Sequence, residues 1–199
     1  MKTEKTNLNT ANTIVIFIDM QLGSISTIQS MKSEELQQNA LSFAKICTIL
    51  QLPIIISSAD IPGNRGKVLP ELSNLLPQAI HIKHATNNSW ETPEFVTTIA
   101  KTGRKNLVMA GLATDVGLCL PAISAVAAGY QVYAIVDVSG TLNTRIEQAA
   151  WLRMMQAGVI LTSWTGFTGE IQHNYTQEPG SELLPIIGEH LHSQNGVFP

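Results

Sequence analysis

The fold of this chain is constrained most by a repeated alternation between short apolar runs and longer helical stretches. Six runs are rich in Ile and Val and continuously apolar: residues 13–18, 53–56, 79–82, 107–110, 131–136 and 159–161. Continuous runs of this length are typical of central parallel strands buried on both faces. The runs therefore predict a largely parallel sheet.

The segments between these runs carry helical periodicity. Helices are expected over 33–50, 92–102, 116–128 and 144–157, with Gly103, Gly129 and Gly158 where helix C-caps belong. The order β-α-β-α predicts a three-layer α/β/α fold with a doubly wound, mostly parallel six-stranded sheet. We expect residues 1–199 to form a single domain.

The stretch from about residue 169 onward is less periodic. Residues 182–192 could form a final helix, in which Leu183, Leu184, Ile186 and Ile187 are apolar. A surface tail and a contact between subunits are both compatible with this pattern.

Composition and charge exclude several classes of protein. Hydrophobic residues make up 44% and charged residues 14%, which excludes a disordered chain. The net charge of −3 gives no excess of positive charge of the kind that binds nucleic acid. The first apolar run ends in Asp19 and is too short for a signal peptide or a membrane span. We therefore expect no membrane partner and a cytoplasmic location.

Ligands of open α/β sheets bind beyond the carboxyl ends of the strands, so polar residues at those ends are candidate site residues. Asp19 follows the first strand, Lys83 the third, and the turn containing Thr114 and Gly117 the fourth. Asp19 could instead cap the next segment, and a lone Lys83 is usually solvated. After the fifth strand, Asn143 or Thr141 is expected to cap a helix.

Motifs for other chemistries are absent from the sequence. It contains no Gly-x-Ser-x-Gly elbow, no Walker A motif and no Gly-x-Gly-x-x-Gly after a strand. Two cysteines allow no cysteine-based zinc cluster, and the pair His190 and His192 is more typical of a surface than of a ligand set. We expect neither a metal nor a cofactor.

The order of these pieces resembles a known family. An Asp after strand one, a Lys after strand three and the turn Gly111-Leu112-Ala113-Thr114-Asp115-Val116-Gly117 are similar to the isochorismatase-like hydrolases, which include nicotinamidases and carbamoylsarcosine amidases. The segments 122–125, 129–132, 137–141 and 150–154 resemble the YcaC-type branch. The resemblance implies a hydrolase that acts on a small molecule and assembles as a homo-oligomer.

The resemblance implies a catalytic Asp-Lys-Cys triad, matched here by Asp19, Lys83 and, at the cysteine position, Gly117. It also implies a cis peptide between Leu112 and Ala113, which would aim the amides of Ala113 and Gly117 into the pocket as an oxyanion hole. Glycine cannot act as the nucleophile. Cys119 lies about 200° around the helix from residue 117, so we expect it in the core.

The missing cysteine leaves three alternatives. True isochorismatases, which this chain resembles at Gly117, cleave a vinyl ether by proton transfer, although Thr114 and Asp115 look like the amidase branch. In the first alternative, the chain is accordingly a hydrolase that works without a covalent intermediate, with Asp19 as the acid or base and Lys83 as its partner. The second alternative is an inactive relative that binds a small carbonyl compound or serves as an assembly subunit, and the third is an accidental or engineered loss. The candidate pocket walls are Phe17, Gln21, Trp90, Thr114 and Thr141.

Overall fold

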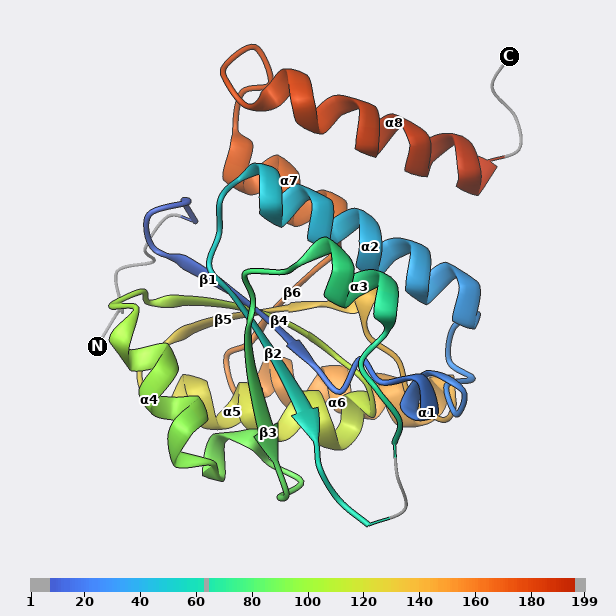
Figure 1. The fold of residues 1–199 in the computed structure, drawn as a ribbon, viewed down its shortest axis with the longest axis vertical. Helices are drawn as coiled ribbons and strands as arrows, with labels where there is room; N and C mark the ends of the chain where they lie inside the picture. Colours follow the sequence, from blue (N-terminus) through green and yellow to red (C-terminus); the bar gives the residue numbers. More distant parts are fainter. Residues whose placement is uncertain (1–7, 63–64, 196–199) are drawn as a thin grey trace.

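The computed structural model describes residues 8–62 and 65–195, which form one six-stranded sheet with all neighbouring strands parallel (Figure 1). The strand order is β3-β2-β1-β4-β5-β6. The strands are β1 (Thr13–Ile18), β2 (Ile54–Ala59), β3 (Ile80–His84), β4 (Asn106–Gly111), β5 (Gln131–Ile135) and β6 (Ile160–Thr162). The predicted fold class is confirmed.

The central strand β1 shows why its apolar run is continuous. Side chains alternate between the two faces of a strand, and both faces of β1 are covered by helices. Val15 and Phe17 contribute to the core on one face, whereas Ile14 and Ile16 contribute to the core on the other. All four side chains are fully buried.

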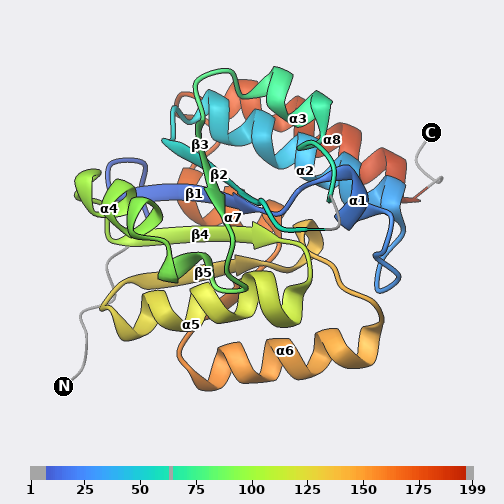
Figure 2. The ribbon, with the colours of Figure 1, turned by 60° about the horizontal axis from the view of Figure 1, so that its bottom comes forward.

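Helices cover the sheet in two layers (Figure 2). One layer holds α2 (Ser33–Ile49), α3 (Pro70–Leu75), α7 (Trp164–Gln172) and α8 (Gly180–Asn195), and the other holds α4 (Pro93–Lys101), α5 (Cys119–Ala127) and α6 (Thr144–Gln156). The short helix α1 (Leu22–Ile25) follows β1 at the carboxyl edge. No helix in the described part of the chain is long and apolar enough to cross a membrane.

The helix predicted over 116–128 differs most from the structure. A π-helical turn (Thr114–Leu118) comes first, and the regular helix α5 starts only at Cys119. The other predicted helices lie within a few residues of their expected ends, and Asn143 caps α6 by accepting a hydrogen bond from the Ile146 amide at 3.0 Å. No clear helical periodicity marks the short helices α1 and α3, nor α7.

The carboxyl-terminal segment is a helix that packs on its own domain. Helix α8 lies over α2 and α7 in Figure 1, with Leu183 fully buried and Ile186 and Ile187 packed against the core. Leu184 remains 49% exposed. Three of the four apolar side chains predicted for this tail are therefore accounted for within one chain.

The strand order reverses between β1 and β4, which makes the carboxyl ends of these two strands the topological switch point. Connections leave the two strands toward opposite faces there, so a crevice opens between them. Asp19 directly follows β1, and the turn that leads to Gly117 directly follows β4. The fold thus brings these two predicted site residues together.

Candidate active site

Asp19 is held in an unusual backbone conformation at the switch point. Its φ of 56° lies in the left-handed region, where Asp is one of the residues tolerated best. Its Oδ1 accepts hydrogen bonds from the Ala59 amide at 2.8 Å and from His84 Nε2 at 3.0 Å. Backbone strain of this kind concentrates at functional sites. Here it places the buried Asp19 carboxylate between the ends of β1, β2 and β3.

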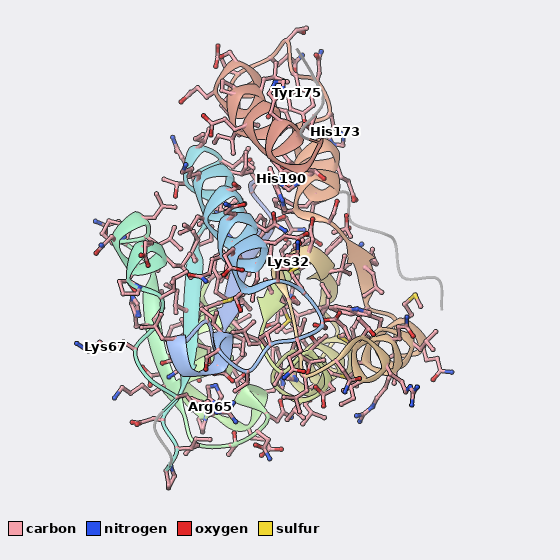
Figure 3. All side chains as sticks on the ribbon, turned by 90° about the vertical axis from the view of Figure 1, so that its right-hand side faces the viewer. Lys32, Arg65, Lys67, His173, Tyr175 and His190 are labelled. Carbon is pink, nitrogen blue, oxygen red and sulfur yellow. The ribbon has the colours of Figure 1, made fainter. Side chains whose placement is uncertain are left out.

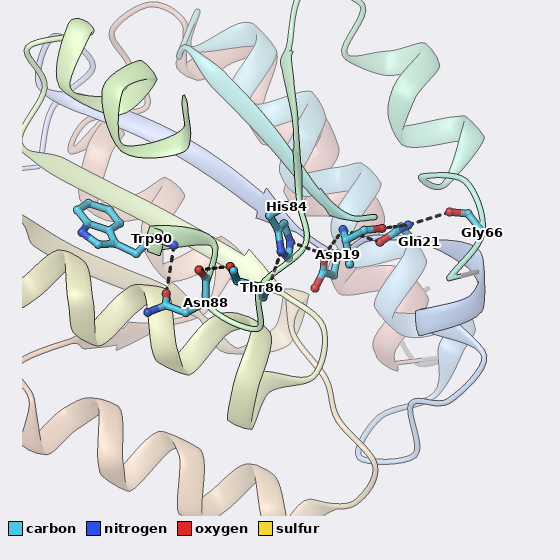
Figure 4. A network of polar contacts seen from close by, with 8 residues as sticks. Asp19, Gln21, Gly66, His84, Thr86, Asn88 and Trp90 are labelled. Carbon is cyan, nitrogen blue, oxygen red and sulfur yellow. Dashed lines mark hydrogen bonds and ion pairs between the residues drawn. The ribbon is translucent and has the colours of Figure 1, made fainter. Parts of the chain in front are cut away.

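His84, the last residue of β3, is the charged partner of Asp19 (Figure 4). Its Nδ1 lies 2.8 Å from the carbonyl oxygen of Thr86, which can only accept, so Nδ1 carries a proton. Burial by itself lowers the pKa of His84, but the hydrogen bond and negative charge of Asp19, together with the Thr86 carbonyl, outweigh it and raise the pKa above its usual value. The raised pKa favours the protonated form of His84 beside Asp19.

Lys83 does not contact Asp19. Its ammonium pairs with Asp60 at 3.2 Å, and the two side chains are 74% and 66% exposed. Successive residues of a strand point to opposite faces, so only one of two neighbours can reach the crevice. On β3 that residue is His84, which shares its face with the buried Ile82. The predicted pairing of Asp19 with Lys83 is corrected to a pairing with His84.

Residue 117 must be a glycine because the backbone of Leu112 approaches it closely. An ideal Cβ on this residue would lie 2.5 Å from the carbonyl oxygen of Leu112, a separation that real Cβ atoms do not show. The same Cβ would lie 3.3 Å from Asp19 Oδ2. The second carboxylate oxygen of Asp19 therefore faces the position where a side chain of residue 117 would begin.

The predicted oxyanion hole is only partly present. Among the described residues the one cis peptide is Glu178–Pro179, so the peptide between Leu112 and Ala113 is trans, contrary to expectation. Ala113 instead turns the chain with a φ of 51°. The Gly117 amide donates to the Ala113 carbonyl at 2.7 Å and is not available to a ligand. Ala113 directly follows Leu112, which forms a parallel bridge with Gly140.

A cavity of about 230 Å³ opens beside this pair. Asp19, His84, Gly117 and Ala113 contribute to its walls, and so does Arg65 from the loop after β2. This volume suits a small molecule rather than a polymer. A larger cavity of about 540 Å³ lies at the opposite edge of the sheet, where Arg104, its one charged lining residue, donates to the backbone carbonyls of Thr10 and Thr13. We place the site where the ionisable groups converge.

A second cavity, of about 300 Å³, adjoins the first and shares Arg65, Ala113 and Val116 with it. Thr141 lines it and donates to Asp115 at 2.6 Å. Behind this wall, Glu147 accepts hydrogen bonds from Ser30 at 3.0 Å and Thr114 at 3.2 Å. Burial raises the pKa of Glu147, and these hydroxyl donors counteract the effect.

The other predicted wall residues lie elsewhere. Phe17 is fully buried in the core beside Phe43, because its position on β1 faces the α2 layer. Trp90 packs edge-on against Phe95 and Tyr130. Thr114 is fully buried toward Glu147.

Gln21 does not line either cavity but positions a wall. Its Nε2 donates to the Gly66 carbonyl at 2.8 Å and its Oε1 accepts from the Ala59 amide at 3.0 Å. Figure 4 shows Gln21 joining Asp19 to the Gly66 loop. Of the five predicted walls, therefore, Thr141 alone has its side chain at a cavity.

The two cysteines offer no replacement nucleophile. Cys47 and Cys119 are both buried, and burial is the main factor that raises the pKa of each thiol. Cys119 packs among core residues of the α5 layer, as predicted. No group of three or more His, Cys, Asp or Glu side chains within residues 8–62 and 65–195 is arranged to hold a metal ion.

Comparison with known proteins places this site in a family. The model of the isochorismatase domain matches residues 13–166. The chain belongs to the isochorismatase family. A curated relative, "Probable hydrolase YcaC" of Escherichia coli (strain K12), is 30% identical over 178 residues, which cover 89% of this chain and 85% of the relative.

Solved structures of isochorismatase-family members support the YcaC branch. YcaC from Pseudomonas aeruginosa, with hexane-2,5-diol and covalent acrylamide, is 33% identical with a TM-score of 0.89, covering 97% of this chain and 95% of the other. The Escherichia coli YcaC gene product, described as an octameric hydrolase of unknown specificity, is 27% identical with a TM-score of 0.85, covering 95% and 98% of the two chains. The present chain is therefore an isochorismatase-family hydrolase of the YcaC branch.

Two residues of the site of this family member were not predicted from the sequence. His84 had a detectable signal, because the alternation around Ile82 puts His84, not Lys83, on the buried face of β3. Arg65 had none, because it lies in a loop and reaches the cavities only through the folding of that loop onto residues 21–23.

Proposed function

We propose that this protein hydrolyses a small molecule with water as the nucleophile and Asp19 as the group that carries the proton. The observation behind the proposal is the orientation of the Asp19 carboxylate. Oδ1 is occupied by Ala59 and His84, whereas Oδ2 faces the cavity beside Gly117. A carboxylate with one oxygen held and one directed at bound substrate is suited to general acid-base catalysis.

The reaction then needs no covalent intermediate. Asp19 Oδ2 accepts a proton from a water molecule as the water oxygen bonds to the substrate carbon. The bond from that carbon to the leaving oxygen or nitrogen breaks, and Asp19 returns the proton to the leaving atom. For a vinyl ether the order is reversed. A protonated Asp19 donates its proton to the vinyl carbon, and water adds to the resulting cation and gives one proton back to Asp19. The C–O bond of the hemiketal then breaks, and the proton of its hydroxyl group passes to the leaving oxygen, which releases an alcohol and a carbonyl compound. In both cases the contact of His84 Nε2 with Oδ1 fixes the orientation of the Asp19 carboxyl group.

A panel of vinyl ethers, amides and other C–N substrates tests this proposal. We expect turnover of at least one compound and its loss in Asp19→Asn, which keeps the shape but cannot accept the proton. Asp60→Asn is the matched control, because it removes an exposed carboxylate of the same rim. Turnover in H₂¹⁸O should place ¹⁸O in the product and none on the protein. A folded protein without turnover, or an active Asp19→Asn variant, would contradict the proposal.

A second candidate function is the binding of a small carbonyl compound without catalysis. It is favoured by the Gly117 amide, which donates to the Ala113 carbonyl and is not available to stabilise an oxyanion. Saturable binding of a compound that the folded protein does not turn over supports this candidate, and turnover of the bound compound rejects it.

We also infer that the protein forms a homo-oligomer. The Escherichia coli relative is described as octameric, and α6 exposes Leu152 and Met155 at 60% and 48% of their surfaces. Light scattering coupled to size-exclusion chromatography tests this inference, and a monomer at micromolar concentration would reject it.

A further inference from the structure

Arg65 occupies a special place at the junction of the two cavities. It lines both, and no other Lys or Arg in the described part of the chain lines either one. Its side chain is exposed, and among the described residues it takes part in no ion pair. Figure 3 shows Arg65 beside the α1 segment, while the neighbouring Lys67 points outward from the molecule. No carboxylate within residues 8–62 and 65–195 pairs with this guanidinium, which is thus available to a ligand.

The backbone of Arg65 is fixed by contacts to the segment after β1. The Gly23 amide donates to the Arg65 carbonyl at 2.8 Å. An ideal Cβ on Gly23 would lie only 2.6 Å from that carbonyl oxygen, so glycine is needed for this approach. The Gln21 side chain holds the next carbonyl, that of Gly66, at 2.8 Å. The same segment that positions Asp19 therefore also positions Arg65.

The charges around the junction favour an anion there. The carboxylate of Asp19 is balanced by His84, whose pKa is raised by that contact. Ala113, an uncharged residue, also lines both cavities. Asp115 lines only the second cavity, where its negative charge disfavours an anion deeper inside.

We propose that Arg65 binds a carboxylate of the substrate at the junction of the two cavities, and that the substrate is therefore a small organic acid. Guanidinium binds carboxylate through two parallel hydrogen bonds, which fixes orientation as well as affinity. An apolar part of the substrate fits the second cavity, where Ile28, Val116 and Leu142 form the wall. This assignment rests on the proposed function for its reaction, but its binding step stands on Arg65 alone.

Binding of benzoate and acetophenone tests the assignment without requiring turnover. The two probes share size and an aromatic ring, but only benzoate carries a charge, and neither can be hydrolysed. By isothermal titration calorimetry at low ionic strength, we expect benzoate to bind more tightly than acetophenone. Arg65→Met should weaken benzoate binding about 10- to 100-fold. Lys67→Met, which removes an outward-pointing cation of the same loop, should change it less than about 2-fold.

The outcomes separate this inference from the proposed hydrolase activity. Equal binding of the two probes, binding of neither, or unchanged benzoate binding by a folded Arg65→Met variant would overturn the role of Arg65. Loss of binding in Lys67→Met as well would overturn it too, since the effect would then come from net charge. Benzoate binding through Arg65 in a protein without turnover would reject the hydrolase proposal and leave this one standing.

Discussion

Gly117→Ala tests whether this backbone is adapted to glycine at the position that the family resemblance assigns to a cysteine. The new Cβ would lie 2.5 Å from the Leu112 carbonyl oxygen and 3.3 Å from Asp19 Oδ2. The first contact involves backbone and cannot be relieved by a rotamer change. Either the peptide between residues 112 and 113 rotates or the π-helical turn moves away from β4, and both changes disturb the packing of the fully buried Leu112, Thr114 and Leu118.

The size of the effect follows from the cost of overpacking a tight interior. Inserting a methyl group into a well-packed site typically destabilises by about 1–3 kcal/mol. For a chain of this length each kcal/mol lowers the melting temperature by roughly 2–4 °C. We therefore expect Gly117→Ala to melt about 2–12 °C below the parent protein. Urea unfolding followed by circular dichroism measures the difference in the free energy of unfolding.

A matched control is available in α8. Gly188 has no atom within 4 Å of its ideal Cβ, and it lies in a helix interior. Gly188→Ala should therefore stabilise the protein by about 0.5–1 kcal/mol, because alanine has the higher helix propensity. If Gly117→Ala were as stable as the parent protein while Gly188→Ala behaved as expected, the argument from the Leu112 carbonyl would be refuted.

Three further predictions concern neighbouring groups. Lys83→Ala should leave activity and probe binding unchanged. It should lower the free energy of unfolding by about 0–1 kcal/mol, since the pair of Lys83 with Asp60 is exposed. A loss of activity as large as that of Asp19→Asn would restore Lys83 to the site. The pKa of His84 is raised in the folded state, so its ion pair contributes stability that is fully present below about pH 6.5 and lost as pH rises through the folded value. The advantage of the parent protein over His84→Gln in urea unfolding should accordingly shrink at higher pH, and an advantage that grows would contradict the pairing. Native protein incubated with acrylamide should show no adduct by mass spectrometry, because Cys47 and Cys119 are buried and their pKa values are raised; rapid modification before unfolding would place a reactive thiol in the site.

The sheet was predictable because each strand carries its own signal. The run at 13–18 became β1 with the same ends, and the other five strands lie within three residues of the predicted ends. A strand that is buried on both faces needs apolar residues at successive positions, and this signal can be recognised without knowledge of distant contacts. The helices α1, α3 and α7 were not predicted, because they are short or contain glycine and polar residues that blur the helical period.

The candidate site was predictable only in part. Asp19 and Gly117 could be named from the sequence, because the ends of neighbouring parallel strands meet at one edge of the sheet. The choice between Lys83 and His84 depended on which face of an edge strand turns toward the crevice. Phe17 and Trp90 were assigned to the pocket by proximity along the chain, whereas packing buries Phe17 in the core and places the half-buried Trp90 against the core on the other face of the sheet.

The sequence by itself determined the order of strands and helices, the carboxyl-edge position of Asp19 and the absence of a nucleophile at residue 117. These properties are local, since they follow from apolar runs and from the identity of single residues. Only the tertiary structure decided that His84 is the partner of Asp19, that the Leu112 carbonyl excludes a side chain at residue 117, and that Arg65 reaches the cavities. These properties depend on approaches of a few ångströms between segments far apart in the chain. The alternation along β3 indicates that His84 faces inward, but it does not indicate that His84 meets Asp19.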